Sequence, residues 1–167
     1  MRKRPLCVAG LLAVLALVAV STATAGAGGN GTMTMTTIGH NDLLFSFPIK
    51  NPCTGAAGTV AAVAANDVFH VTFFTAPGAD EFWITGTGEG TATFTPNNPS
   101  DISASGHFAA WFGESTNNQN DVQHDINNFQ LIGTDGSRTT IHATDHLSTN
   151  ANGVVTVSFS NFTFSCG

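Results

Sequence analysis

Apolar and polar residues alternate with a period of two along residues 33–166. Thr, Val, Phe and Ile recur between clusters of Gly, Asn, Asp and Pro, and no window keeps a helical period. This alternation is typical of strands, because successive side chains of a strand point to opposite faces of its sheet. The pattern predicts an all-β chain with strands over approximately residues 33–39, 42–49, 57–65, 67–75, 81–87, 90–95, 102–113, 121–133, 138–148 and 154–165.

The connections between these strands are short and rich in turn residues, such as Pro77-Gly78, residues 86–90 and residues 96–99. Strands joined by short connections pair antiparallel with their neighbours in sequence. We therefore expect an antiparallel meander closed into a small barrel of lipocalin or calycin size, with a two-sheet β-sandwich as the alternative. No repeat of fixed period and no domain boundary interrupts residues 33–167, which are expected to form a single β domain.

Turn chemistry also predicts the register of the last strands. Residues 134–137 read Thr-Asp-Gly-Ser, which favours a two-residue hairpin loop and places Ile126 opposite Asp145. At the next turn, the apolar pattern favours a three-residue loop over residues 151–153 with Gly153 left-handed, because a slip of one residue exchanges the faces of the strand. In this register a β-bulge is expected near Ser160-Asn161, and the core face collects Ile126, Ile141, Leu147, Val155, Val157 and Phe159.

The first 25 residues have the pattern of a cleaved signal peptide. Arg2, Lys3 and Arg4 precede an apolar run over residues 6–20, and Ala23 and Ala25 match the small-residue cleavage pattern. The run is shorter than the roughly 20 residues that a membrane-spanning helix needs. We therefore expect export, cleavage after Ala25, a disordered leader over residues 26–32 and no membrane span after cleavage.

Cleavage changes the charge balance. Residues 26–167 keep only Lys50 and Arg138 against eleven acidic residues, a formal charge of −9. Because a phosphate backbone is bound through clusters of Lys and Arg, this composition argues against nucleic acid as a partner. Anionic membrane surfaces are disfavoured for the same reason.

Cleavage also removes Cys7 and leaves Cys53 and Cys166. A pair of cysteines in an oxidising compartment usually forms a disulfide, which here would join the two ends of the domain. The alternative is a reactive thiol or a metal ligand, although neither cysteine lies in a Cys-x-x-Cys motif.

Short motifs along the mature chain give one resemblance. Residues 51–55 (Asn-Pro-Cys-Thr-Gly), Trp111-Phe112-Gly113, Asp135-Gly136-Ser137 and the ending from residue 151 to Cys166 resemble uncharacterised exported β-proteins of actinobacteria. The resemblance implies export, a β fold and a cysteine near each end. It implies no activity.

Histidine is the residue type most suggestive of chemistry. His142 and His146 would lie roughly 13 Å apart on one strand, too far to share a metal ion, and no His-x-His occurs. A metal site would need residues from different strands, such as His107, His124 and His146 with Asp125. We therefore expect no metal and no cofactor.

In the expected register, His124 lies diagonal to Asp145 on the core face. Such a pair could transfer a proton or provide the polar contact of a ligand cavity, and it could equally be structural. His124 and Asp145 are therefore the catalytic candidates. Trp83, Trp111 and Phe112 are the ligand-binding candidates, with core packing as the alternative.

Three functional hypotheses are compatible with these patterns. The first is a non-enzymatic barrel that binds a small apolar or amphipathic ligand. The second is a structural or interaction protein of the cell envelope with a filled core. The third is a cofactor-free barrel enzyme that uses His124 and Asp145, so the sequence leaves enzymatic activity open. An enclosed cavity would separate the first from the second.

Overall fold

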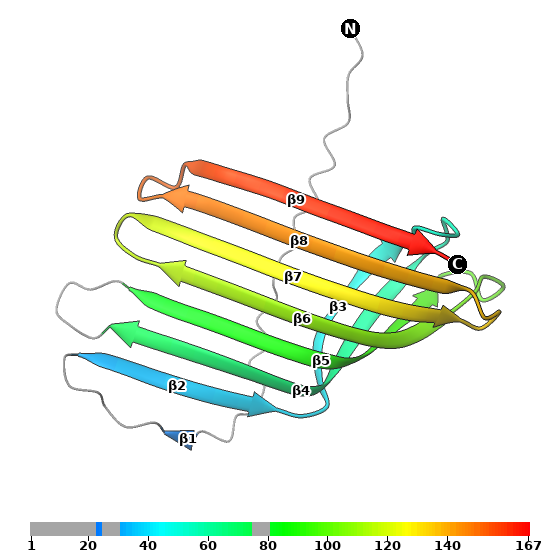
Figure 1. The fold of residues 1–167 in the computed structure, drawn as a ribbon, viewed down its shortest axis with the longest axis horizontal. Helices are drawn as coiled ribbons and strands as arrows, with labels where there is room; N and C mark the ends of the chain where they lie inside the picture. Colours follow the sequence, from blue (N-terminus) through cyan, green and yellow to red (C-terminus); the bar gives the residue numbers. More distant parts are fainter. Residues whose placement is uncertain (1–22, 25–30, 75–80) are drawn as a thin grey trace, which may run out of the picture.

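The computed structural model describes residues 23–24, 31–74 and 81–167, and within these ranges every regular element is a strand (Figure 1). The prediction of an antiparallel all-β chain is confirmed. No helix in these ranges has the length and hydropathy needed to cross a membrane. The strands are β1 Ala23–Thr24, β2 Thr32–Gly39, β3 Asp42–Lys50, β4 Ala57–Phe74, β5 Phe82–Pro96, β6 Ala104–Thr116, β7 Asn120–Gly133, β8 Arg138–Asn150 and β9 Val155–Cys166.

The strands form one open sheet. Its hydrogen-bonded order is β1-β2-β4-β5-β6-β7-β8-β9, and β3 pairs with the other part of β4 (Figure 1). In the described part of the chain β9 does not pair with β2 or β3, so the expected barrel is not closed, and the strands do not divide into the two sheets of a sandwich. The expected signal peptide and leader fall largely outside the described residues.

Two long strands replace four predicted short ones. Residues 57–65 and 67–75 were expected to be separate, but β4 runs through them with a bulge between Ala64 and Asn66. Residues 81–87 and 90–95 likewise form the single strand β5. The glycines there are not a turn: a Cβ at Gly86 would lie 2.6 Å from the ring of Phe69 and 2.7 Å from that of Phe112. Glycine at this position provides space for packing within a strand.

The sheet has a covered half and an open half. β3 pairs with residues 57–64 of β4, and its residues Leu44, Phe45 and Ile49 pack over the core on the face of the sheet that carries Phe108. Phe108 is fully buried there, with the ring of Phe45 5.9 Å away. We call the part of the sheet over which β3 packs the covered half. β2 instead pairs with residues 67–74 of β4. Those residues and their neighbours on β5–β8 form the open half. The core comprises Ala62, Ala64, Ala92, Phe94, Ala104, Phe108, Phe129, Leu131 and Ile141.

The first hairpin loop of the last three strands is one residue longer than expected. The N–H of Gly133 donates to the carbonyl of Ser137 at 2.8 Å, and Gly136 has a φ of +85°. The loop therefore contains three residues with a left-handed glycine, a geometry that an Asp-Gly sequence also permits. The expected pairing of Ile126 with Asp145 is wrong, because Ile126 lies opposite Thr144.

The second loop has the predicted geometry. The N–H of Asn150 donates to the carbonyl of Val154 at 2.9 Å, and Gly153 has a φ of +72°. The expected bulge near Ser160-Asn161 is wrong, since pairing there is regular. The register shift instead lies at Thr156, which is skipped in the strand pairing because Thr149 pairs with Val155 and Ser148 with Val157. The Thr156 hydroxyl still donates to the carbonyl of Ser148 on β8 at 3.1 Å.

This earlier bulge and the longer first loop together divide the expected core face between two faces. Leu147 lies opposite Ser158, so Val157 lies on the other face from Leu147. We call the face that carries Phe108 and Phe129 the inner face and the opposite one the outer face. Ile141 and Leu147 lie on the inner face, and Ile126, Val157 and Phe159 lie on the outer face. The expectation that these residues share one core face is wrong.

The predicted disulfide is confirmed. Cys53 and Cys166 have an S–S distance of 2.06 Å and a Cα–Cα distance of 5.7 Å. The bond joins the end of β9 to the loop after β3, so it fastens the two edges of the covered half. A disulfide of this kind is compatible with an oxidising extracellular environment.

Candidate functional site

The structure separates the two catalytic candidates. Because the hairpin loop has three residues, His124 pairs with His146 and Asp125 pairs with Asp145. Neighbouring residues of a strand point to opposite faces, so His124 lies on the outer face and Asp145 on the inner face. The diagonal contact expected between His124 and Asp145 is therefore not made.

The three ligand-binding candidates are also divided. Trp83 and Trp111 lie on the outer face with exposed fractions of 58% and 37%. Trp83 packs edge-on against Phe74, with the ring centroids 6.0 Å apart. Phe112 lies on the inner face, where its ring is 6.0 Å from that of Phe69. The candidates do not form one binding platform.

The inner face of the open half has an apolar side, formed by β2, β4, β5 and the adjoining part of β6. Met33 pairs with Phe73, and Met35 pairs with Val71. Met33, Met35 and Phe73 keep exposed fractions of 41%, 37% and 38%. Since no strand of the described chain crosses this part of the sheet as β3 crosses the other, its apolar side chains remain partly in contact with water. We define the apolar side as Met33, Met35, Phe69, Val71, Phe73, Phe82, Ile84 and Phe112.

Four carboxylates lie on the remaining part of the same face, beside uncharged residues such as Gln123 and Leu147, and we call these four the acidic side. Glu114 pairs with Ile84 of the apolar side, and Asp125 pairs with Phe112. Asp145 lies opposite Asp125 on β8. Thr116 Oγ1 donates to Asp121 Oδ1 at 3.3 Å. The acidic side comprises Glu114, Asp121, Asp125 and Asp145.

Burial and repulsion by nearby carboxylates disfavour the charged forms of two members of the acidic side, Glu114 and Asp125. Burial raises the pKa of Asp125, and the neighbouring Asp145 carboxylate raises it further, against a smaller opposite effect of His124. Burial raises the pKa of Glu114, and Asp121 and Asp125 add to the effect. Lys50 and Arg138, at the end of β3 and the start of β8, lie on the covered half. The acidic side therefore has no lysine or arginine neighbour in residues 31–74 and 81–167, and His124 is the basic side chain that acts on Asp125.

A further carboxylate lies where the two halves meet. Asp67 is only 5% exposed on the inner face of β4, and its Oδ1 has no hydrogen-bond partner among the described residues. Burial raises the pKa of Asp67, and the nearby Asp42 raises it further. The side chain of Leu44 lies close to Gly88 beside Asp67, so this carboxylate is under the edge of the core and not on the accessible acidic side.

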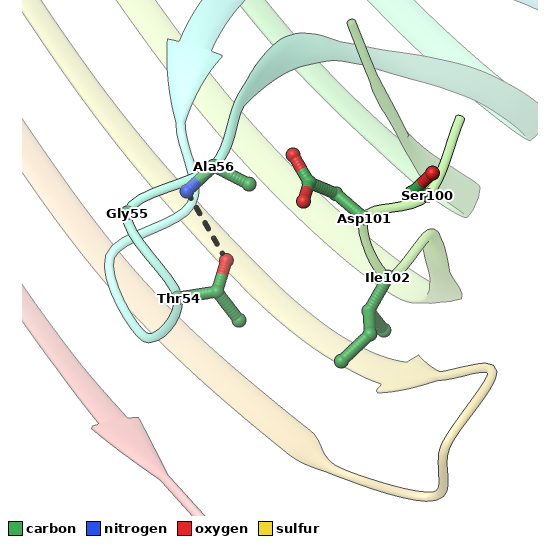
Figure 2. Close-up of a pocket in the computed structure, with 6 residues that line it drawn as sticks. All are labelled: Thr54, Gly55, Ala56, Ser100, Asp101 and Ile102. Carbon is green, nitrogen blue, oxygen red and sulfur yellow. Dashed lines mark hydrogen bonds between the residues drawn. The ribbon is translucent and has the colours of Figure 1, made fainter. Parts of the chain in front are cut away.

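Figure 2 shows a hollow at the covered end of the sheet, between the loop after β3 and the loop after β5. Its volume is about 390 Å³, and Asp101 is its one charged lining residue. Thr54 Oγ1 accepts a hydrogen bond from the N–H of Ala56 at 3.2 Å, so this polar atom serves the turn. The hollow therefore offers few groups for recognition. It is lined by Thr54, Gly55, Ala56, Ser100, Asp101 and Ile102.

The inner face of the open half is the candidate site, because it combines exposed apolar side chains with carboxylates that have no lysine or arginine neighbour in the described ranges. No group of three or more His, Cys, Asp or Glu side chains in the described ranges is arranged to hold a metal ion. The arrangement suits a ligand with an apolar part and a positive charge. Sequence reasoning missed the acidic side, because the shift of one residue in the register of β7 and β8 brings Asp125 to the face of Asp145.

No family model, no curated protein and no solved structure matches the chain. The resemblance to exported actinobacterial proteins therefore stays an expectation, and function is argued from geometry and chemistry alone.

Proposed function

We propose that this protein is an exported, non-enzymatic binding module that takes an amphipathic, positively charged ligand on the inner face of its open half. The barrel cavity expected from the sequence is replaced, in this proposal, by an open sheet face. One observation supports it above the others: the apolar side adjoins four carboxylates that have no lysine or arginine neighbour among the described residues.

Both parts of the ligand would gain free energy on this face. Burying apolar surface contributes roughly 25 cal/mol per Å², and Met33, Met35 and Phe73 each have more than a third of their surface still to bury. A cation placed between Asp125 and Asp145 relieves their repulsion and favours their ionised forms. A negatively charged ligand of the same shape would be repelled.

The test compares two detergents of equal chain length below their micellar concentrations. Isothermal titration calorimetry of the full protein is expected to show saturable binding of dodecyltrimethylammonium and none of dodecyl sulfate. The double variant D125N/D145N should weaken binding of the cation about tenfold, which corresponds to about 1.4 kcal/mol. Equal binding of both detergents, or an unchanged affinity in the double variant, would contradict the proposal.

Two controls separate binding from folding. E89Q removes one negative charge from the exposed outer face of β5 and should leave the affinity unchanged. A raised pKa means that the folded state favours protonated Asp125, so ionisation costs stability as the pH rises through the folded-state pKa, and this cost is absent below the ordinary Asp pKa. D125N should therefore stabilise the free protein at neutral pH while it weakens binding. A purely structural carboxylate would lower stability when replaced.

A second candidate function, an interaction protein, is favoured by the edge strand β9. All twelve residues of β9 are exposed, and no charged residue occurs from Leu147 to the end of the chain. By contrast, the edge strand β3 carries Asp42, Pro48, Lys50 and a bulge, which are common devices against edge-to-edge pairing. On an acidic chain, an uncharged edge can meet the same edge of a second copy without repulsion between like charges.

Antiparallel pairing of β9 with β9 of a second copy would make a two-fold dimer. Analytical ultracentrifugation is expected to show a dimer that S158K, which places a cation on β9, converts to monomer. The matched variant S105K, on the exposed outer face of the interior strand β6, should remain dimeric. A wild-type monomer at all accessible concentrations would rule out this second candidate. The cofactor-free enzyme gains no support, because His124 and Asp145 lie on opposite faces.

A further inference from the structure

We propose that His124 and His146 form a two-histidine binding site for a divalent transition-metal ion, with Zn²⁺ as the ion that fits the geometry. The site lies on the outer face of the open half, on the opposite side of the sheet from the acidic side. It rests on the position of the two imidazole rings. His124 on β7 pairs directly with His146 on β8, and their Nδ1 atoms lie 3.3 Å apart.

The separation of the two nitrogens matches tetrahedral coordination. Zn²⁺ binds imidazole nitrogen at about 2.0–2.1 Å, and two such ligands at the tetrahedral angle lie about 3.3–3.4 Å from each other. A square-planar ion would need its neighbouring ligands closer, at about 2.8 Å. The observed 3.3 Å therefore lets one tetrahedral ion bind both Nδ1 atoms with little movement of either ring.

Neighbouring aromatic rings hold the two imidazoles in this position. The ring of Trp111 on β6 lies 5.6 Å from that of His124. Phe159 on β9 stacks on His146 with a centroid distance of 5.1 Å and an interplanar angle of 13°. The four rings form a row across β6–β9. Rings held from both sides lose little freedom on binding an ion, and this lowers the cost of assembling the site.

The ring nitrogens of two other histidines, His70 and His142, already take part in hydrogen bonds to other side chains. His142 Nδ1 lies 2.7 Å from Asn128 Oδ1, and its Nε2 lies 3.2 Å from Thr144 Oγ1. His70 Nδ1 lies 2.9 Å from Thr36 Oγ1. In the described part of the chain, the Nδ1 atoms of His124 and His146 face each other, whereas those of His70 and His142 face a hydroxyl or an amide oxygen. Such an arrangement serves either a single His–His hydrogen bond or a shared ion.

The chain supplies two ligands to this site and leaves the others open. Asp125 and Asp145 lie on the inner face and do not reach it, and the paired neighbours along the same row are Gly113 and Phe159. This agrees with the lack of any larger ligand cluster in the described ranges. The remaining positions would be taken by water or by a donor group of another molecule, as at zinc sites with an open coordination position.

The test titrates the full protein with Zn²⁺ alone and measures the heat of binding at neutral pH, where imidazole is available as a ligand. We expect one ion per chain. H124Q and H146Q should each weaken binding at least about tenfold. H107Q, which removes an exposed histidine from the same face, should bind like the wild type. In nitrogen-15 NMR spectra, the Nδ1 signals of His124 and His146 should shift together on addition of Zn²⁺.

Two results would overturn the inference. Unchanged Zn²⁺ affinity in both H124Q and H146Q would show that the two rings share only a hydrogen bond. Loss of Zn²⁺ binding in D125N/D145N, with the histidine variants unaffected, would place the ion on the acidic side instead. Because the variants H124Q and H146Q change half-buried rings outside the core, circular dichroism of each should show an intact β fold.

Discussion

Replacing Cys53 and Cys166 together with serine is expected to lower the free energy of unfolding by about 4.7 kcal/mol, the chain-entropy value for closing a loop of roughly 100 residues. The disulfide spans a sequence separation of 113 and joins the end of β9 to the loop after β3. Without it, the two edges of the covered half are no longer connected, since β3 and β9 share no hydrogen-bonded pairing. The unfolded chain would also gain the freedom that the bond removes.

Urea denaturation followed by circular dichroism measures this effect. The midpoint should fall, and wild-type protein in reducing agent should show the same fall, whereas the serine variant should no longer respond to reducing agent. A loss below about 1 kcal/mol would mean that the sheet holds β3 and β9 in place without the bond.

Replacing Phe108 with alanine is expected to cost about 3–5 kcal/mol of stability. Phe108 is fully buried at the centre of the inner face of the covered half. Its ring lies 5.9 Å from that of Phe45 on β3 and 6.4 Å from that of Phe129 on β7. Removal of the ring leaves a cavity between the sheet and the strand that covers it.

F164A is the matched control, since Phe164 lies on the same face of β9 with an exposed fraction of 51%. Its loss should stay below about 1 kcal/mol. F108L keeps part of the volume and should be intermediate, so the comparison remains measurable if F108A does not fold. Equal losses for F108A and F164A would show that the core does not lie where the covered half places it.

The two proposed sites have a common structural origin. Because the open half of the sheet is a single layer, its inner and outer faces are both accessible over β6, β7 and β8. Asp125 and Asp145 point inward, and their sequence neighbours His124 and His146 point outward. Adjacent residues of two paired strands thus build an acidic side on one face and a histidine pair on the other. The two sites point to opposite faces and can be probed by separate substitutions, although the charge of His124 acts on Asp125.

Several features of the fold could be predicted from short-range patterns. The two-residue period over most of the chain predicts strands, and the even number of cysteines in residues 26–167 predicts the disulfide. The loop over residues 151–153 was predicted because Asn-Gly favours a left-handed glycine and the apolar pattern chooses the loop length. These predictions depend on local conformational preferences and on the pairing of cysteines in an oxidising environment, both of which can be inferred from the sequence.

Other features depend on packing between distant residues. Gly86 reads as part of a turn, but it lies within β5 because the rings of Phe69 and Phe112 need the space of a missing Cβ. Residues 134–137 fit a two-residue or a three-residue loop, and the side chains across β7 and β8 decide between them. That one-residue difference separates His124 from Asp145 and brings it to His146. The local sequence does not determine the loop length, because residues 134–137 are compatible with both loops.

The sequence by itself therefore determined the strand character of the chain, its acidic balance and the bond between Cys53 and Cys166. Only the tertiary structure decided that the sheet stays open, that β3 covers half of it, and which side chains share a face. The physical reason is that a strand exposes alternate residues to opposite sides, so a single step in register exchanges its two faces. The register of β7 and β8 is set by contacts made across the whole sheet.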